Sequence, residues 1–192
     1  MKNSQRMSTQ TLVMSAVLTA LVVILQLMGT FVKFGPFAIS LVLIPIVIGT
    51  ATCGKGIGAW LGFVFGLVVL LSGDAAPFLA VNIPGTILTV LVKGTMCGLI
   101  SGIAYQCALK LFKSNTYLST VIAAIVCPIV NTGVFVIGCL LFFMPTIATW
   151  AGGTSTITYI FASMIGINFL IELAVNIVFS PIIVRILKAI KK

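Results

Sequence analysis

Long apolar stretches separated by short breaks dominate this sequence, and they constrain its fold more than any other feature. A helix needs about 20 mostly apolar residues to cross a bilayer. We therefore expect six transmembrane helices, over Leu12–Met28, Phe37–Ala51, Ile57–Leu71, Gly85–Leu109, Leu118–Phe143 and Tyr159–Leu187. Because the second and third stretches are short and the last is long, we expect a compact but irregular bundle.

The composition favours a membrane protein and excludes a soluble one. Of the 192 residues, 60% are hydrophobic and only 7% are charged, whereas a soluble domain carries about 25% charged residues. A chain this apolar cannot cover itself with a water-facing surface, so soluble enzymes, disordered chains and nucleic-acid-binding proteins are excluded. The sequence therefore predicts an all-α integral membrane protein that forms a single domain over residues 1–192.

The side chains that usually carry catalysis are almost absent. The sequence has no histidine, and its two acidic residues are Asp74 and Glu172. Histidine acid–base catalysis, zinc sites and carboxylate-rich calcium or magnesium sites are therefore excluded. No GxxxxGK[ST] phosphate-binding loop is present in the sequence, so the chain cannot hydrolyse ATP by itself. We expect a protein that is not an enzyme, uses no cofactor or metal, and works by binding and movement.

The basic residues gather on one side of the predicted membrane topology. Six helices place both termini and two loops on the same side, together with Lys2, Arg6, Lys55, Lys110, Lys113, Arg185, Lys188, Lys191 and Lys192. Only Lys33 and Asp74 fall on the opposite side. Because basic loops stay in the cytoplasm, this bias predicts cytoplasmic N- and C-termini in a multi-pass protein of the plasma membrane. The basic residues then contact anionic lipid rather than nucleic acid.

Three segments on the predicted outer side are rich in loop-forming residues, and each is placed to cover a cavity. They lie around Lys33–Phe37, Asp74–Asn82 and Pro145–Ser155, and the last carries Trp150 beside two glycines. Aromatic residues at a membrane interface also anchor proteins among the lipid headgroups. A lid and a lipid anchor therefore stay open as alternatives, and Trp150 and Asn82 are candidate substrate contacts.

Glycines recur at four-residue spacing in the third and fourth apolar stretches. They share one face of each predicted helix, and they are Gly58, Gly62, Gly66, Gly94, Gly98 and Gly102. Small residues let helix backbones approach closely in lipid. We expect these stripes to pack inside the bundle, with docking of a partner protein as the alternative.

A few polar and charged residues lie inside the predicted spans, where a charge normally faces the bundle interior and pairs. Lys93 lies in the fourth span and Glu172 in the sixth. Two roles stay open for Lys93: a structural ion pair with Glu172, or neutralisation of an anionic group on a bound ligand. The candidate substrate-binding residues are Lys93, Asn131, Thr132, Asn168, Trp150 and Asn82.

Several segments of the sequence resemble one family of membrane proteins. They are an AxxxA pair at Ala16 and Ala20, the run Phe34–Pro45 followed by Ile48 and Gly49, and the run Trp60–Gly66. In their order and spacing along nearly the whole chain, they resemble the substrate-binding S components of energy-coupling factor (ECF) vitamin transporters.

The resemblance implies a binding subunit that works with separate partners. Members of that family bind a vitamin from outside, and a transmembrane T component with two cytoplasmic ATPases supplies the driving force. The small residues that match Ala16 and Ala20 pack against the T component, and the ligand pocket lies in the outer half of the bundle. The bundle is expected to topple in the membrane and turn its pocket to the cytoplasm. Placing Lys93, Asn131 and Asn168 in that pocket is our inference from their depth.

The substrate is less constrained than the family. The segment Phe37–Gly66 is most similar to pantothenate-type S components. Pantothenate carries one carboxylate and several hydrogen-bonding groups, which suit one lysine with asparagine and threonine neighbours. S components for riboflavin or folate stay open. So do two other classes, a stand-alone secondary transporter and a structural subunit of a membrane complex.

Overall fold

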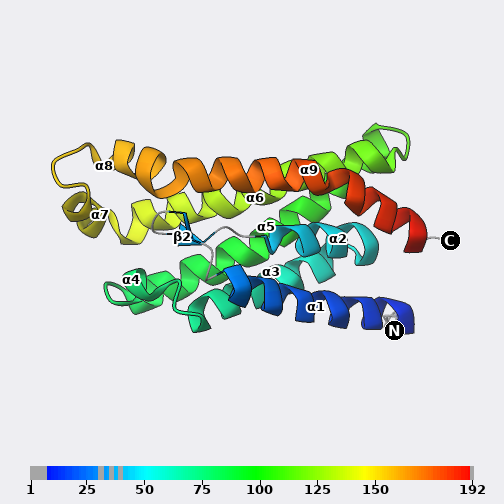
Figure 1. The fold of residues 1–192 in the computed structure, drawn as a ribbon, viewed down its shortest axis with the longest axis horizontal. Helices are drawn as coiled ribbons and strands as arrows, with labels where there is room; N and C mark the ends of the chain where they lie inside the picture. The colour runs from blue at the N-terminus through cyan, green and yellow to red at the C-terminus, as the bar shows by residue number, and fades with distance from the viewer. Residues whose placement is uncertain (1–7, 30–32, 35–36, 39–40, 191–192) are drawn as a thin grey trace, which may run out of the picture.

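The computed structural model describes residues 8–29, 33–34, 37–38 and 41–190, which are helical apart from one short hairpin and the turns (Figure 1). In chain order the elements are α1 (Thr9–Gly29), β1 (Lys33–Phe34), β2 (Phe37–Ala38), α2 (Leu43–Cys53), α3 (Lys55–Leu71), α4 (Ala76–Leu79), α5 (Ile83–Leu111), α6 (Thr116–Phe142), α7 (Met144–Trp150), α8 (Thr156–Thr158), the π-helix η1 (Tyr159–Gly166) and α9 (Ile167–Ile190).

Four helical segments in the described part of the chain are long and apolar enough to cross a membrane: Thr9–Gly29, Ile83–Leu111, Thr116–Phe142 and Thr156–Leu187. They correspond to the first, fourth, fifth and sixth predicted spans. By contrast, α2 and α3 have 11 and 17 residues, and a rise of about 1.5 Å per residue makes both shorter than a hydrocarbon core of about 30 Å. The all-helical architecture is therefore confirmed, and the crossing of the membrane by α2 and α3 stays a prediction.

The predicted start of the second helix at Phe37 is wrong. Phe37–Ala38 form β2, which pairs antiparallel with β1 in the register Lys33↔Ala38 and Phe34↔Phe37. The helix α2 begins only at Leu43. A short apolar run fits either a strand or a buried helix, and here pairing between strands takes the backbone hydrogen bonds. The lid role predicted for Lys33 and Phe37 concerns side chains outside the described part of the structure.

Two predicted outer loops contain short helices. The first half of Pro145–Ser155 belongs to α7, and Asp74–Asn82 contains α4. Pro145 and Pro77 lie in the first turns of these helices, where a proline costs no hydrogen bond because the first N–H groups have no intrahelical partner. Both helices lie at one end of the molecule (Figure 1). The prediction of an entirely irregular segment is therefore wrong for both.

The glycine stripes of α3 and α5 face each other and bring the two backbones into contact. A Cβ added to Gly62 would overlap the Gly94 carbonyl oxygen, and one added to Gly98 would overlap the Gly58 carbonyl oxygen. Any side chain at these positions would force the helices apart. The prediction of internal packing is confirmed, and α5 lies between α3 and α6 in the bundle (Figure 1).

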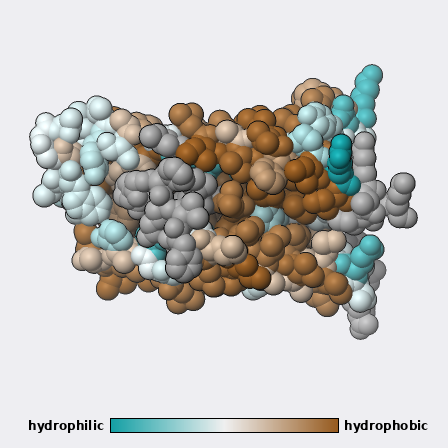
Figure 2. All heavy atoms as spheres, viewed as in Figure 1, coloured by the Kyte–Doolittle hydropathy of each residue, from teal (hydrophilic) through white to brown (hydrophobic). Residues whose placement is uncertain are grey.

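The two ends of the bundle are polar and its middle is apolar. Figure 2 shows a broad hydrophobic belt between hydrophilic ends, as a surface facing lipid requires. The start of α1, the end of α9 and the turns that carry Lys55 and Lys110 all lie at one end (Figure 1). Other members of the predicted basic face lie outside the described residues: Lys2, Arg6, Lys191, Lys192 and the side chain of Lys188.

Candidate functional site

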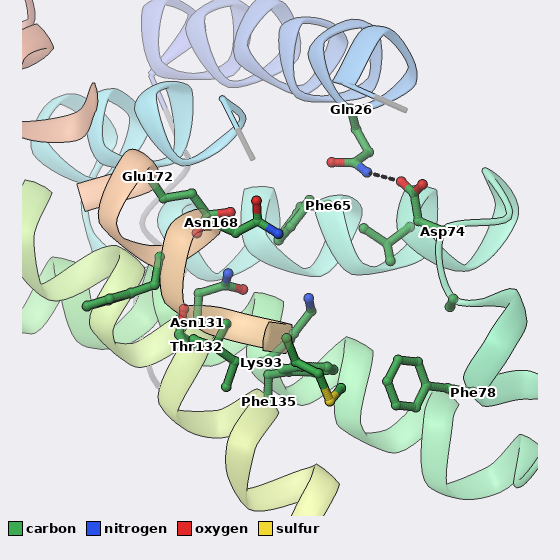
Figure 3. Close-up of a pocket in the computed structure, with 15 residues that line it drawn as sticks. Gln26, Phe65, Asp74, Phe78, Lys93, Asn131, Thr132, Phe135, Asn168 and Glu172 are labelled. Atoms are coloured by element: carbon green, nitrogen blue, oxygen red, sulfur yellow. Dashed lines mark hydrogen bonds between the residues drawn. The ribbon is translucent and has the colours of Figure 1, made fainter. Parts of the chain in front are cut away.

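A cavity lies between α3, α5, α6 and the η1–α9 segment, with one residue of α1 and the segment around α4 completing its wall (Figure 3). It contains about 740 Å³ of space not filled by protein atoms, including its opening. The residues that line it are Gln26, Phe65, Val69, Asp74, Ala75, Phe78, Lys93, Asn131, Thr132, Phe135, Met164, Ile165, Asn168, Phe169 and Glu172. A mostly apolar wall with a few polar groups is typical of sites for small molecules.

Lys93 is the one cationic side chain in the described lining of this cavity. Its Nζ lies 5.2 Å from the centre of the Phe135 ring and 5.6 Å from the centre of the Phe65 ring, within the range of a cation–π contact. Within the described part of the chain, Nζ makes no hydrogen bond or ion pair, with Glu172 or with any other acceptor. An ammonium has three N–H donors, so Lys93 lines the cavity with donors that the described residues do not use.

Two buried amides face the same cavity from neighbouring helices. Asn131 of α6 and Asn168 of α9 are 5% and 9% exposed. The Oδ1 atom of each is shielded from solvent and has no hydrogen-bond partner among the described residues. Leaving such a group without a partner costs about 1–3 kcal/mol. Thr132 adds a hydroxyl to the same wall.

Two carboxylates also line the cavity. Asp74 accepts hydrogen bonds from Gln26 Nε2 at 2.9 Å and from Ser72 Oγ at 3.2 Å. Glu172 is 6% exposed and lies four residues after Asn168 on α9, so the two side chains share one face of the helix. The described lining therefore contains more hydrogen-bond acceptors and more carboxylates than cations.

Phe78 of α4 connects the cavity wall to α7. Its ring makes edge-to-face contacts with the rings of Phe135, Phe143 and Trp150, at centroid distances of 5.6, 5.0 and 5.6 Å. Each such contact contributes about 0.5–1.5 kcal/mol beyond its buried area. Trp150 does not line the described cavity but packs on Phe78, which does. It therefore supports the wall from behind.

The structure brings four of the six predicted substrate-binding residues to this one cavity: Lys93, Asn131, Thr132 and Asn168. Asn82 lies elsewhere, because its Oδ1 accepts a hydrogen bond of 3.0 Å from the Gly85 backbone N–H and caps the first turn of α5. Asparagine is a preferred residue at that position of a helix, so its side chain is occupied by the fold.

The sequence reasoning missed several residues of the wall. Gln26 had a signal, because it is the one long polar side chain in the apolar stretch Leu12–Met28. The phenylalanine rings had none, because phenylalanine is common throughout such stretches; those in the wall are Phe65, Phe78, Phe135 and Phe169.

The π-helix η1 shapes the side of the cavity next to α9. It contributes Met164 and Ile165 to the wall. Its i→i+5 hydrogen bonds widen the turn, and such segments are frequent at functional sites. At its last residue, a Cβ added to Gly166 would lie 2.9 Å from the Phe161 carbonyl oxygen, so the wide turn disfavours a side chain there. A change of helical period moves which residues face the cavity.

A second concave surface lies on the outside of the bundle, between α1 and α3. It is lined by Leu12, Ser15, Ala16, Thr19, Ala20, Ile57 and Trp60. Ala16 and Ala20 are exposed. Trp60 is 50% exposed, and its Nε1 donates to Thr19 Oγ1 at 3.3 Å. The AxxxA pair therefore lies on an open apolar surface, away from the cavity.

Comparison with known proteins identifies the family. The family model described as "ECF transporter, substrate-specific component" matches residues 10–184, whereas neither curated proteins nor solved structures give a match. Members of this family are transport subunits rather than enzymes, and the family implies a substrate together with T-component and ATPase partners. With its long apolar helices, the chain is a multi-pass membrane protein. It belongs to the substrate-specific S components of ECF transporters.

Proposed function

We propose that this S component captures a small vitamin with an anionic group, pantothenate being the first candidate, in the cavity that Lys93 lines. The observation that carries the proposal is the Lys93 ammonium, which contacts two aromatic rings and uses no acceptor among the described residues. A cation in such a place requires a partner. A ligand carboxylate supplies that partner through charge-assisted hydrogen bonds.

The neighbouring side chains support a ligand that is polar beyond its carboxylate. Asn131, Thr132 and Asn168 offer amide and hydroxyl groups in the same cavity. Pantothenate combines one carboxylate with an amide and two hydroxyls, so it matches both parts of the wall. Asp74 accepts hydrogen bonds from Gln26 and Ser72, and these bonds offset part of its repulsion of an anion.

A second candidate is favoured by the aromatic part of the wall. Four phenylalanines line the cavity, namely Phe65, Phe78, Phe135 and Phe169. Rings of this kind stack on flat ligands, so a vitamin with a planar ring system, riboflavin or folate, is the alternative. Under this reading the rings rather than Lys93 supply most of the affinity.

Delivery is proposed to need the partners that the family implies. The exposed Ala16 and Ala20 on α1 would receive the T component, and two cytoplasmic ATPases would drive toppling of the bundle, whose termini lie in the cytoplasm. The separation of the α1 surface from the cavity supports this division, because docking then leaves the ligand contacts untouched. A stand-alone transporter and a structural membrane subunit are the competing classes.

The first experiment measures binding of pantothenate, riboflavin, folate, thiamine and biotin to the detergent-purified protein by calorimetry. We expect pantothenate to bind, and Lys93→Met to weaken that binding by about 2 kcal/mol or more, as loss of a buried charged partner does. The matched control is Lys110→Met, at the exposed end of the same helix, which should leave the dissociation constant unchanged.

Two other results would change the proposal. Tight binding of riboflavin or folate that Lys93→Met does not weaken would favour the second candidate. Uptake by cells that express this chain without a T component and its ATPases would favour a stand-alone transporter. If no compound binds to a folded sample, a structural role would be favoured instead.

A further inference from the structure

We infer that the part of the ligand remote from its anionic group carries N–H or O–H donors, which the amide oxygens of Asn131 and Asn168 accept. This inference rests on the proposed function, and it names the chemical class of the substrate: an anion with hydrogen-bond donors at its other end. It is carried by the two amides, independently of Lys93.

The first observation is that both oxygens are buried without a partner. Asn131 and Asn168 are more than nine-tenths buried, and neither Oδ1 has a hydrogen-bond partner in the described residues although both side chains line the cavity. Figure 3 shows the two side chains extending from α6 and α9 into the same space. Buried polar atoms in native structures almost always have partners, so a molecule that fills the cavity is the missing one.

The second observation is the chemistry around the two amides. Glu172, one turn beyond Asn168, adds a carboxylate, which accepts hydrogen bonds when ionised. The side of the cavity formed by α6 and α9 is therefore rich in acceptors. A second anionic group on the ligand would be repelled there, whereas hydroxyl or amide N–H groups would pair.

The inference separates ligands that the anionic contact alone does not. A fatty carboxylate satisfies Lys93 but leaves the two amide oxygens unpaired. Pantothenate offers two hydroxyls and an amide N–H, and biotin offers two ureido N–H groups at the end opposite its carboxylate. A site built around such donors rejects an analogue that lacks them, because its own buried groups then stay unpaired.

The experiment measures dissociation constants of the full-length protein in detergent for three probes: pantothenate, its analogue with both hydroxyls replaced by hydrogen, and octanoate. We expect the analogue and octanoate to bind at least tenfold more weakly than pantothenate. Asn131→Ala and Asn168→Ala should each weaken pantothenate about tenfold to a hundredfold. The same variants should change binding of the dideoxy analogue by less than threefold, since the lost donor and the lost acceptor form one interaction.

The matched control is Asn176→Ala on the same helix as Asn168. Asn176 is also buried with an unpartnered Oδ1, but it does not line the cavity. It should leave the dissociation constant of pantothenate within threefold of the wild type. The melting temperature of each unliganded variant shows whether it is folded, and the comparison of probes on the wild type needs no variant at all.

Distinct results overturn the inference and the proposed function. If Lys93→Met weakens pantothenate but the dideoxy analogue and both asparagine variants bind like the wild type with pantothenate, the anionic contact stands and the donor class is wrong. If the asparagine variants lose affinity while Lys93→Met does not, the donor class stands and the anionic contact is wrong. Absence of binding by every vitamin of the five overturns both.

Discussion

Gln26 and Asp74 are joined by a hydrogen bond of 2.9 Å that ties α1 to the segment between α3 and α4. They lie 48 residues apart in the sequence, and both line the cavity. The same helix α1 carries Ala16 and Ala20 on its exposed side. The proposed docking helix therefore reaches the cavity wall through one buried side chain, and this contact makes the first prediction.

Replacing Gln26 by leucine should lower stability and weaken ligand binding together. The leucine keeps the apolar packing of α1, but Asp74 loses a hydrogen bond to a charged acceptor, worth about 1.5–3 kcal/mol. Thermal unfolding in detergent and calorimetry with the bound vitamin measure the two effects. Ser72→Ala removes another donor to Asp74 from a residue outside the cavity lining, and should lower only the melting temperature. Equal melting temperatures for Gln26→Leu and the wild type would contradict the prediction.

Replacing Asn82 by alanine should affect stability but not affinity. Its side chain caps α5 and does not line the cavity, and loss of such a cap costs about 1 kcal/mol. Asn115 caps α6 in the same way, through the backbone N–H groups of Tyr117 and Leu118. Asn115→Ala is therefore the matched control and should behave alike. A tenfold loss of vitamin affinity in Asn82→Ala alone would return this residue to the binding site.

Replacing Gly62 by alanine should disrupt the packing of α3 against α5. The added Cβ overlaps the Gly94 backbone, which cannot move without separating the helices, and overpacking of this kind costs about 1–3 kcal/mol or more. Gly133 of α6 has nothing within 4 Å of an added Cβ. Gly133→Ala should be neutral or stabilising by up to about 1 kcal/mol, because alanine favours helix. Melting temperatures in detergent test the pair, and similar values for both variants would show that α3 and α5 can separate at little cost.

Replacing Ala16 or Ala20 by tryptophan should abolish uptake and leave ligand binding intact. The large ring fills the surface between α1 and α3 that we propose as the T-component site, whereas the cavity lies elsewhere. Calorimetry on the isolated protein and uptake in cells that also express the T component and its ATPases separate the two effects. Val17 is exposed on α1 but does not line that surface, so Val17→Trp should transport normally. Wild-type uptake by Ala16→Trp and Ala20→Trp would exclude this face as the docking site.

Much of the site was predictable because polar residues are scarce in this chain. A lysine or an asparagine inside an apolar span has to face the interior of the bundle, so Lys93, Asn131 and Asn168 were found without any structure. That argument does not apply to Asn82 near a helix end, where an asparagine side chain also serves as a cap. Only the hydrogen bond to Gly85 assigns its role.

The sequence by itself determined that this is a helical membrane protein, where its long helices lie and which few charges they contain, because the bilayer allows few alternatives for an apolar chain. The close contact of α3 with α5 was also predictable, since glycines at four-residue spacing have one main structural use in lipid. Only the tertiary structure decided that Phe37–Ala38 pair as a strand, that η1 widens its turn, and that Gln26 meets Asp74. These features depend on contacts between distant segments, and hydrophobicity along the chain carries no record of which apolar side chains meet.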